Sequence, residues 1–510
     1  MLVWCASPAV ASFIALAAAS PTVQMRIGQT SLIVFLAKVF GTVISFVATI
    51  IFARVLGAEV YGVYAVIIAL LAWLKMFGTF GIGTAVKKRI SEGTEQNEYF
   101  TAGLLWMLAL AGGICILLLI AEPLVERYIS DFEQDTALSL VGFLILLLGI
   151  RLSFSYVDFT LQGQKLVHVA GLLEPVRLGL KSTFQVAFVV LSYGLTGMLF
   201  GYAIGVAIAA LIGLVFVSLR VTRPATAHVK SLFDYAKYSW LGSLKSQAYQ
   251  DIDILILGAM VQSSLVGIYA IAWSLTKVLR LFGQAISEAV FPEISSLSAT
   301  EGVEATVGYI EDAVAYSGLI VIPGFVGGTL LAERLLALYG AEFLQGTEVL
   351  WLLLLGVVAY AYMRQFLTAM NALDRPDLAF RVNIIFVAIN VGCNIVLIWW
   401  LGWVGAAIAS LISTVSGMVL AYGLLRTVVS ISLPVGDVAR QGVAAGVMGT
   451  VVFGLDVLVQ RTELIETNVV ILFGLVAVGA AVYGGVLFAI APNFRAVIRR
   501  NMPMAISSWR

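Results

Sequence analysis

Nine basic side chains lie within segments of this chain that are otherwise apolar, and they indicate what chemistry the chain could perform. The nine are Lys38, Lys75, Arg151, Arg177, Lys181, Lys245, Lys277, Arg280 and Arg364. A charge at the centre of a bilayer costs roughly 2.5–3.5 kcal/mol on insertion scales, so such residues should face protein or water. Acidic residues at comparable depth are fewer, namely Asp158, Glu174, Asp251, Asp253 and Glu288. A cavity lined by these side chains would be cationic and would bind an anion such as a phosphate group.

An internal repeat places two of these charges at equivalent positions. Residues 62–78 read GVYAVIIALLAWLKMFG and residues 267–283 read GIYAIAWSLTKVLRLFG, with seven of seventeen positions identical. Lys75 aligns with Arg280, so a positive charge is kept inside an otherwise apolar helix. Two related halves are a common plan for membrane transporters that bind their substrate between the halves.

Transmembrane helices are the elements that must position these residues. Hydrophobic residues make up 61% of the 510 residues and charged residues only 12%, whereas soluble domains carry about 25% charged residues. A membrane helix needs about 20 apolar residues to cross a bilayer. Fourteen segments qualify, at approximately 29–53, 60–85, 99–120, 136–160, 168–192, 195–219, 234–258, 263–290, 307–331, 347–371, 378–401, 403–426, 437–458 and 468–490. We therefore expect an all-α membrane protein with about 14 transmembrane helices.

The placement of lysine and arginine predicts how the helices are oriented. With the chain start in the cytoplasm, 17 of the 30 lysines and arginines fall in cytoplasmic segments and only four in outer loops. An even number of helices returns the chain to its starting side. We therefore expect a multi-pass protein of the cell membrane with both termini in the cytoplasm.

The repeat also predicts the domain boundaries. Residues 26–225 should form an N-terminal lobe of helices 1–6, residues 226–430 a C-terminal lobe of helices 7–12, and residues 431–510 helices 13 and 14 with a basic cytoplasmic tail. Because each six-helix lobe returns the chain to the same side, a pseudo-twofold axis along the membrane normal should relate the lobes. Residues 1–25 form an extension without the basic start of a signal peptide, and we expect Met25 to be the initiator.

Composition argues against several other classes of protein. The net charge of +1 gives no sign of a nucleic-acid partner. The three cysteines lie at positions 5, 115 and 393, without metal-ligand or disulfide spacing, and the chain has only two histidines. We therefore expect no metal site and no cofactor.

Four motifs carry a resemblance to a known family. The chain resembles the polysaccharide-unit flippases, the Wzx-type branch of the multidrug/oligosaccharidyl-lipid/polysaccharide (MOP) exporter superfamily, in FARVLGAEVYGVYA (52–65), DIDILILGAMVQSSLVGIYA (251–270), FPEIS (291–295) and NALDRP (371–376). The resemblance implies alternating-access transport of an oligosaccharide linked to polyprenyl or dolichyl phosphate or pyrophosphate, from the cytoplasmic to the outer leaflet. It implies as partners this anionic lipid-linked oligosaccharide, membrane lipid, and glycosyltransferases or a polymerase of the same pathway for surface polysaccharide or glycoprotein assembly.

The resemblance also places helices 1, 2, 7 and 8 around a central cavity. We expect the cationic, substrate-binding side chains of that cavity to be Lys38, Lys75, Arg151, Lys245, Lys277, Arg280 and Arg364. Alternatively, lysines near helix ends extend to the headgroups, and Lys245 is close enough to an end for this. Arg177 and Glu174 can pair locally at i, i+3. The asparagines of the stripe at 383, 390 and 394 can simply join helices.

Charged residues at helix ends suggest two gates. We expect an outer gate formed by Arg54, Asp251 and Asp253, and an inner gate formed by Lys88, Arg89, Glu288 and Glu293. The alternative for the outer set is headgroup contact and local pairing. The alternative for the basic run at 87–89 is that it acts only as a topology signal.

Two other functions remain open from the sequence. A cation-coupled multidrug extruder of the same superfamily would commonly have an acidic residue in its first helix, but here that helix carries Lys38 and no acid. A membrane glycan polymerase would need a sizeable domain with carboxylates or a metal, and none of the predicted loops is that long. A transporter rather than an enzyme is therefore expected.

Overall fold

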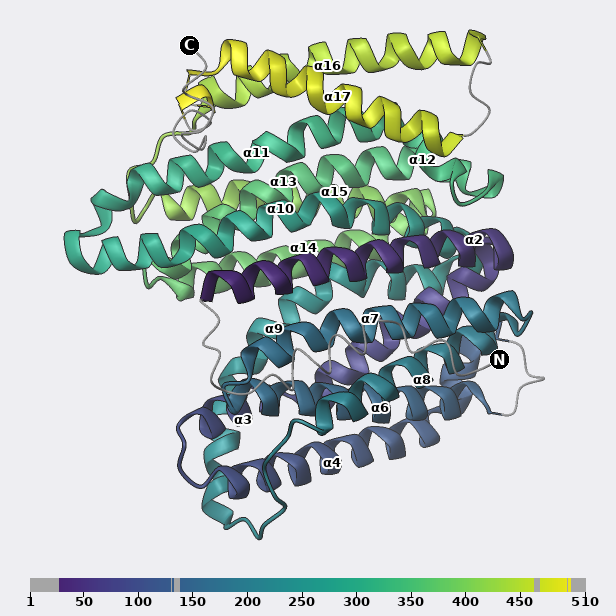
Figure 1. Cartoon of the computed structure of the whole chain (residues 1–510), viewed down its shortest axis with the longest axis vertical. Helices are drawn as coiled ribbons and strands as arrows, with labels where there is room; N and C mark the ends of the chain where they lie inside the picture. The colour runs from purple at the N-terminus through teal and green to yellow at the C-terminus, as the bar shows by residue number, and fades with distance from the viewer. Residues whose placement is uncertain (1–26, 130, 133–137, 463–467, 493, 497–510) are drawn as a thin grey trace. The chain divides into compact units, whose positions relative to one another are not determined.

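The computed structural model describes residues 27–129, 131–132, 138–462, 468–492 and 494–496, and Figure 1 shows their course. Within these ranges the regular structure is entirely helical, without a strand. Eleven of the described helices are long and apolar enough to cross a membrane. The expected all-α membrane fold is therefore confirmed. The extension at residues 1–25, with Met25, lies outside the described residues.

The helices follow the order of the predicted segments. In the first half they are α2 (Ile27–Thr79), α3 (Ile82–Ser91), α4 (Gln96–Ile120), α5 (Glu122–Tyr128), α6 (Leu140–Gly163), α7 (Val167–Val190), α8 (Gly194–Leu214) and α9 (Thr226–Met260). In the second half they are α10 (Ser263–Glu301), α11 (Val307–Leu330), α12 (Ala332–Ala337), α13 (Thr347–Ala372), α14 (Pro376–Leu401), α15 (Val404–Leu425), α16 (Val435–Thr462) and α17 (Asn468–Ile490), with short 3-10 helices at Val303–Thr306 and Ala341–Gly346.

Internal contacts divide the chain into two compact units. Unit 1 comprises Met1–Leu56 and Ile67–Gln247, and unit 2 comprises Gly57–Val66 and Ala248–Arg510. In unit 1, α8 packs along α7 and α6. In unit 2, α15 packs along α13 and α14, while α16 packs against α11 and α17. The division falls inside α9, and one stretch of α2 belongs to unit 2. The lobe boundaries expected from the repeat stay a prediction.

The expected count of 14 spans is not confirmed, although each predicted segment overlaps a helix. The first two segments are two helices that share the label α2 and meet at Gly57, where φ is 79° and ψ is 174° and the backbone is not helical. Left-handed φ of this kind favours glycine because it has no Cβ. Helices α7 and α9 are not among the eleven apolar spans. Both carry several charged residues within their length, including Glu174, Arg177 and Lys181 on α7.

The first glycines of the two repeats, Gly62 and Gly267, meet where α2 crosses α10 in unit 2. A Cβ at Gly62 would lie 1.8 Å from the carbonyl oxygen of Ser263, and a Cβ at Gly267 would lie 2.0 Å from that of Ala58. Each glycine thus touches the carbonyl four residues before the other glycine, which is the reciprocity that a local twofold axis produces. Small residues at such crossings let helix backbones approach closely. The repeat glycines are therefore explained by packing.

Polar side chains join the later helices of each half. Gln185 on α7 is fully buried and donates from Nε2 to the carbonyl of Met198 on α8 at 2.9 Å. In the second half, Asn394 on α14 is also fully buried, and one turn earlier Asn390 donates from Nδ2 to Ser413 Oγ of α15 at 3.1 Å. The interpretation of this asparagine stripe as a joint between helices is confirmed for Asn390 and Asn394.

An ion pair ties the last two helices to the rest of unit 2. Arg334 of α12 pairs through Nε with Asp456 of α16, and its Nη1 donates to Asn468 Oδ1 at the start of α17 at 3.1 Å. Asn468 in turn donates from Nδ2 to the carbonyl of Arg334 at 3.0 Å. Helices α16 and α17 are thus fixed to the α11–α12 corner by a closed polar contact.

Candidate functional site

The basic residues predicted on different helices of the first half gather in unit 1. Lys75 lies on α2, Arg151 on α6 and Arg177 on α7. Two acids accompany them, Glu174 on α7 and Asp158 on α6, and the charges of all four other residues act on Lys75. We call these five residues the Lys75 cluster. It contains three positive and two negative charges, so a positive charge remains in excess.

Two arginines of the Lys75 cluster share one aromatic ring. The guanidinium carbons of Arg151 and Arg177 lie 5.3 and 5.4 Å from the ring centre of Phe154. Arg177 is only 6% exposed. It also donates hydrogen bonds from two nitrogens to the carboxylate of Glu174, one of them from Nε to Oε2 at 2.8 Å. A ring face attracts cations, and a bidentate carboxylate fixes the orientation of a guanidinium. Both arginines are therefore held in place before any ligand binds.

Arg151 retains an unused donor. Its Nη1 is buried and has no hydrogen-bond partner within the described part of the chain. A buried donor without a partner is costly, by about 1–3 kcal/mol, so natural proteins keep one where a ligand or water satisfies it. An oxyanion that binds beside Arg151 would supply the missing acceptor.

A chain of polar contacts leads from the Lys75 cluster toward the end of α3. Asp158 accepts a hydrogen bond from Gln162 Nε2 at 2.8 Å. Gln162 accepts one through Oε1 from Lys87 Nζ at 2.7 Å. The basic run at 87–89, which contains the predicted inner-gate residues Lys88 and Arg89, is thus connected with the charged interior of unit 1.

Arg280 is held by aromatic rings in unit 2. Its guanidinium carbon lies 4.3 Å from the ring centre of Trp273 and 5.6 Å from that of Tyr249. Tyr249, on α9, stacks on Tyr360 of α13 with ring centres 4.0 Å apart and an interplanar angle of 5°. Lys75 and Arg280 occupy equivalent repeat positions, but Lys75 lies among charged residues whereas Arg280 lies against aromatic rings.

A second basic residue of unit 2 is fixed to the same helix. Arg364 of α13 donates from Nε to Ser287 Oγ of α10 at 3.2 Å. Gln365 supports this contact, because its Nε2 donates to the carbonyl of Gly283 at 3.1 Å and its Oε1 accepts from Ser287 at 3.2 Å. Arg280 is part of α10, and Arg364 is bonded to Ser287 of the same helix, about two turns further along.

The other predicted cavity residues are placed less fully. Lys277 is exposed on α10, and the charges of Arg280 and Asp251 act on it. The side chains of Lys38 and Lys245 lie outside the described residues. The structure thus brings Lys75 together with Arg151 in unit 1, and places Lys277, Arg280 and Arg364 on the α10–α13 pair in unit 2.

Asp253, predicted at the outer gate, is instead 5% exposed inside unit 2. Its carboxylate accepts hydrogen bonds from Tyr269 Oη at 2.7 Å and from Asn394 Nδ2 at 2.8 Å. Ser410 Oγ also donates to it. These partners come from α10, α14 and α15, so Asp253 joins four helices. The place of Asp253 in the outer gate stays a prediction.

The remaining gate residues make contacts within their own units. Lys88 Nζ lies 4.8 Å from the ring centre of Tyr235, and Arg89 Nη1 lies 3.0 Å from Glu92 Oε2. In unit 2, Glu288 accepts a hydrogen bond from Gln284 Nε2 at 2.7 Å. The side chains of Arg54 and Glu293 are exposed, and that of Asp251 is half-buried. The two gates stay predictions, since each joins residues of different units.

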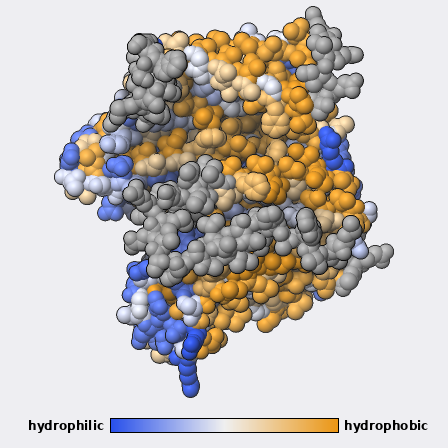
Figure 2. All heavy atoms as spheres, viewed as in Figure 1, coloured by the Kyte–Doolittle hydropathy of each residue, from blue (hydrophilic) through white to orange (hydrophobic). Residues whose placement is uncertain are grey.

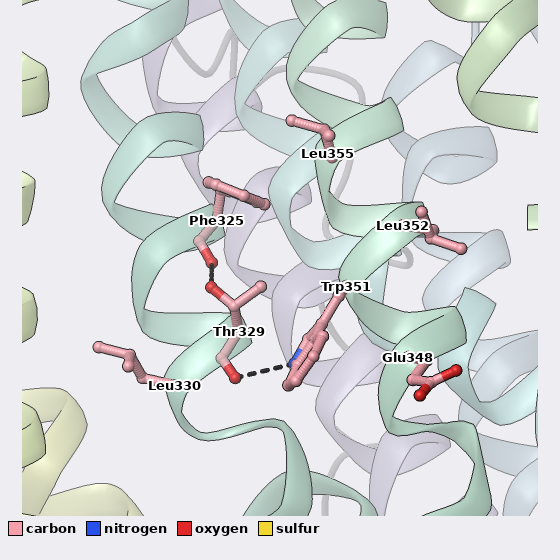
Figure 3. A pocket seen from close by; sticks show the side chains of 7 residues that line it. All are labelled: Phe325, Thr329, Leu330, Glu348, Trp351, Leu352 and Leu355. Atoms are coloured by element: carbon pink, nitrogen blue, oxygen red, sulfur yellow. Dashed lines mark hydrogen bonds between the residues drawn. The ribbon is translucent and has the colours of Figure 1, made fainter. Parts of the chain in front are cut away.

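The cavity between α11 and α13 does not offer an anion site. It has a volume of about 590 Å³ and mainly apolar walls, and its one charged residue is the acid Glu348. Figure 3 shows Trp351 directed across it toward Thr329, whose carbonyl accepts from Trp351 Nε1 at 3.0 Å. Among the described residues there is no group of three or more His, Cys, Asp or Glu that could hold a metal ion.

The cavity expected from the sequence does not include Arg177, but in the structure this residue belongs to the Lys75 cluster. Arg177 pairs with Glu174 as its i, i+3 spacing suggested, yet it also lies beside Arg151 over Phe154. The same ring cannot be assigned to both arginines from spacing alone, because Phe154 and Arg177 are on different helices. Only the presence of three basic residues on helices 2, 4 and 5 could have pointed to the cluster.

Comparison with protein families gives one match that covers the first half. The family model described as "Polysaccharide biosynthesis protein" matches residues 27–298.

Two curated relatives from Haloferax volcanii match over most of their length. One, described as "Probable flippase AglR", is 32% identical over 92% of this chain and 97% of its own. The other, "Probable low-salt glycan biosynthesis flippase Agl15", is 29% identical over 88% of this chain and 94% of its own.

Among solved structures, the chain has the fold of "Lipid II flippase MurJ, inward closed conformation". The TM-score is 0.73 at 16% identity, with 92% of this chain and 100% of that chain covered. At this identity the likeness concerns the fold alone. It agrees with the expected all-α membrane fold.

Proposed function

The chain belongs to the polysaccharide biosynthesis protein family of the MOP exporter superfamily, and from this premise we propose that it is a flippase for a lipid-linked oligosaccharide. It is a multi-pass membrane transporter. It moves the oligosaccharide, linked to a polyprenyl or dolichyl phosphate or pyrophosphate, from the cytoplasmic to the outer leaflet by alternating access. The two relatives from Haloferax volcanii, named as flippases and in one case for glycan biosynthesis, support this proposal.

The Lys75 cluster is the observation that carries the proposal. A lipid-linked sugar bears its negative charge on phosphate groups, and guanidinium groups recognise phosphate oxygens through paired hydrogen bonds. Arg151 offers a buried donor that no protein group occupies among the described residues. Arg151 and Arg177 are already oriented by Phe154, so little side-chain freedom is lost on binding.

The second set of basic residues extends the same chemistry into unit 2. Arg280, Lys277 and Arg364 would contact the substrate at another stage or at another part of the molecule. Lys38 and Lys245 complete the proposed cavity. The rings of Trp273 and Tyr249 hold the guanidinium of Arg280 in place before a ligand binds.

Orientation and gating belong to the proposal as well. Both termini would lie on the cytoplasmic side of the cell membrane. Lys88 and Arg89 would face Glu288 or Glu293 when the inner mouth closes, and Arg54 would face Asp251 when the outer mouth closes. If Arg54 and Asp251 pair, exchanging them (Arg54→Asp with Asp251→Arg) should restore activity that either single change removes. Loss of activity in the exchange variant as well would remove the outer pair.

A cation-coupled multidrug extruder is the alternative transporter. A large organic cation would be repelled by a cluster with excess positive charge, which favours an anionic substrate. A glycan polymerase is less favoured still, because neither curated relative is named as an enzyme. Glycosyltransferases or a polymerase of the same pathway would act before or after transport.

Transport into proteoliposomes tests the proposal directly. Purified protein is reconstituted with radiolabelled lipid-linked oligosaccharide, and access of an external glycosidase to the sugar reports its movement between leaflets. The wild type should accelerate movement, and Arg151→Gln should remove most of the effect. Arg426→Gln, an exposed arginine at the end of α15, should not. Acceleration of a labelled organic cation, with none of the lipid-linked sugar, would establish the extruder instead.

A further inference from the structure

A second basic site lies in unit 1, apart from the Lys75 cluster, where α3 ends and α9 begins. A cavity of about 470 Å³ opens there, which we call the α3–α9 cavity. Its walls are formed by Arg89, Ala227, Lys230, Ser231, Asp234 and Tyr235. Figure 2 shows hydrophilic residues gathered over this end of unit 1, at the lower left, beside a hydrophobic surface over the neighbouring helices.

The residues around the α3–α9 cavity carry more positive than negative charge, since Lys88, Arg89, Lys230 and Lys237 stand against Glu92, Glu95 and Asp234. Arg89 is balanced by Glu92, with Nη1 3.0 Å from Oε2. Asp234 is balanced by Lys237, with Nζ 2.9 Å from Oδ1. The charge of Lys230 also acts on Asp234. Lys88 extends over the ring of Tyr235, while Lys230 is exposed at the wall.

The walls of the cavity are positioned by contacts between three helices. Arg89 lies 5.9 Å from the ring centre of Tyr99 on α4. The ring of Tyr99 meets His228 of α9 edge-on, with ring centres 4.9 Å apart. His228 Nε2 lies 3.1 Å from Glu95 Oε2. Arg89 Nε is buried and has no hydrogen-bond partner among the described residues. A fixed arginine with an unused donor differs from the solvated basic run that a topology signal requires.

The chemistry of the walls suits a sugar phosphate. Lysine and arginine supply the charge and the hydrogen bonds that phosphate oxygens accept. Ser231 and Tyr235 add hydroxyl groups, which can both donate to and accept from sugar hydroxyls. The basic run that ends α3 is joined through Lys87, Gln162 and Asp158 to the Lys75 cluster. The helix that supplies Arg89 to the cavity is therefore also connected with the Lys75 cluster, through Lys87 and Gln162.

We propose that the α3–α9 cavity is an entry site that binds the phosphate group of the lipid-linked glycan before transport. This inference rests on the proposed function and goes beyond it by adding a recognition step outside the Lys75 cluster. The occupant is a phosphate ester that carries both a sugar and an isoprenoid lipid. Bulk anionic phospholipid, which shares the phosphate, is the source that the test must exclude.

Equilibrium binding measures the entry site separately from transport. The full chain is placed in phosphatidylcholine nanodiscs and titrated with radiolabelled dolichyl glucosyl phosphate. Lys230→Gln should weaken binding by about tenfold, since one charge-assisted hydrogen bond to phosphate is lost. Lys230→Arg should bind nearly as the wild type does. Lys165→Gln is the matched control, an exposed lysine of the same unit that does not line the cavity.

Competition identifies the source of the phosphate. Unlabelled dolichyl glucosyl phosphate should displace the label at much lower concentration than phosphatidylglycerol, and Ser231→Ala should reduce this preference. Equal displacement by phosphatidylglycerol would overturn the entry site as a glycan-lipid site. Unchanged binding in Lys230→Gln, with wild-type transport intact, would overturn the cavity but leave the proposed function standing. Absence of transport by the wild type would instead remove the proposed function.

Discussion

The crossing of α2 and α10 at Gly62 and Gly267 can be tested by adding a single methyl group. In Gly62→Ala the new Cβ would start 1.8 Å from the carbonyl oxygen of Ser263, whereas real Cβ atoms essentially never come closer than 3.0 Å. The contact must therefore open by about 1.2 Å, and the atom in the way is backbone, which cannot rotate aside. Forcing an extra methyl group into a packed contact typically costs about 1–3 kcal/mol.

Ala58, which is 1% exposed, can report this opening. Ala58→Cys is introduced after the native cysteines are replaced, and its reaction with a maleimide is followed in membranes. A cost of about 1–3 kcal/mol corresponds to a shift of about 5- to 150-fold in the equilibrium between closed and open crossings. Labelling should therefore accelerate by at least about fivefold when Gly62→Ala is added.

A reciprocal variant and a control complete the experiment. Gly267→Ala should accelerate labelling as well, because its Cβ would lie 2.0 Å from the carbonyl of Ala58. Gly112→Ala, in α4, should have no effect, since nothing lies within 4 Å of the added atom. Unaltered labelling in a normally inserted Gly62→Ala protein would refute the close crossing.

Three further outcomes are expected. Lys75→Ala combined with Arg280→Ala should abolish complementation without impairing membrane insertion, and Lys75→Arg should be milder because positive potential matters more than one donor geometry; full complementation by the inserted double variant would contradict this. Asp253→Ala should lower thermal stability in detergent, because it leaves three buried donors unsatisfied at about 1–3 kcal/mol each. Asp253→Asn should cost less, because the two hydroxyl partners can accept as well as donate. Equal melting temperatures for the two variants would contradict this. Cysteines at Lys88 and Glu293 should crosslink during turnover and stop transport, and a failure to crosslink would exclude the inner gate.

Hydropathy and spacing predict the elements of this fold far better than they predict its contacts. The apolar segments locate the helices, and the repeat aligns Lys75 with Arg280, because both signals are local in the chain. The partners of Asp253 could not be predicted in this way, since Asn394 and Ser410 lie 141 and 157 residues away. Its position in the outer part of a helix suggested exposure, but the choice of face depends on which helices pack against it.

The same limit explains the residues of the Lys75 cluster. Spacing predicts that Glu174 and Arg177 pair on one helix, and this pairing is present. It cannot predict that Phe154, on the preceding helix, faces both Arg177 and Arg151. Lone arginines in apolar helices are therefore best interpreted as candidates whose grouping only the tertiary structure decides.

The two halves have kept a positive charge at the repeat position but have surrounded it differently, and this difference bears on release. A transporter must bind its substrate firmly enough to select it and weakly enough to release it. In unit 1 a phosphate must compete with Glu174 for Arg177, so part of the binding energy replaces an existing ion pair and the net gain is reduced. Around Arg280 the ring contacts are with Trp273 and Tyr249, and among the described contacts no carboxylate grips the guanidinium there as Glu174 grips Arg177. Glu174→Gln should therefore tighten binding of the lipid-linked phosphate and slow its release.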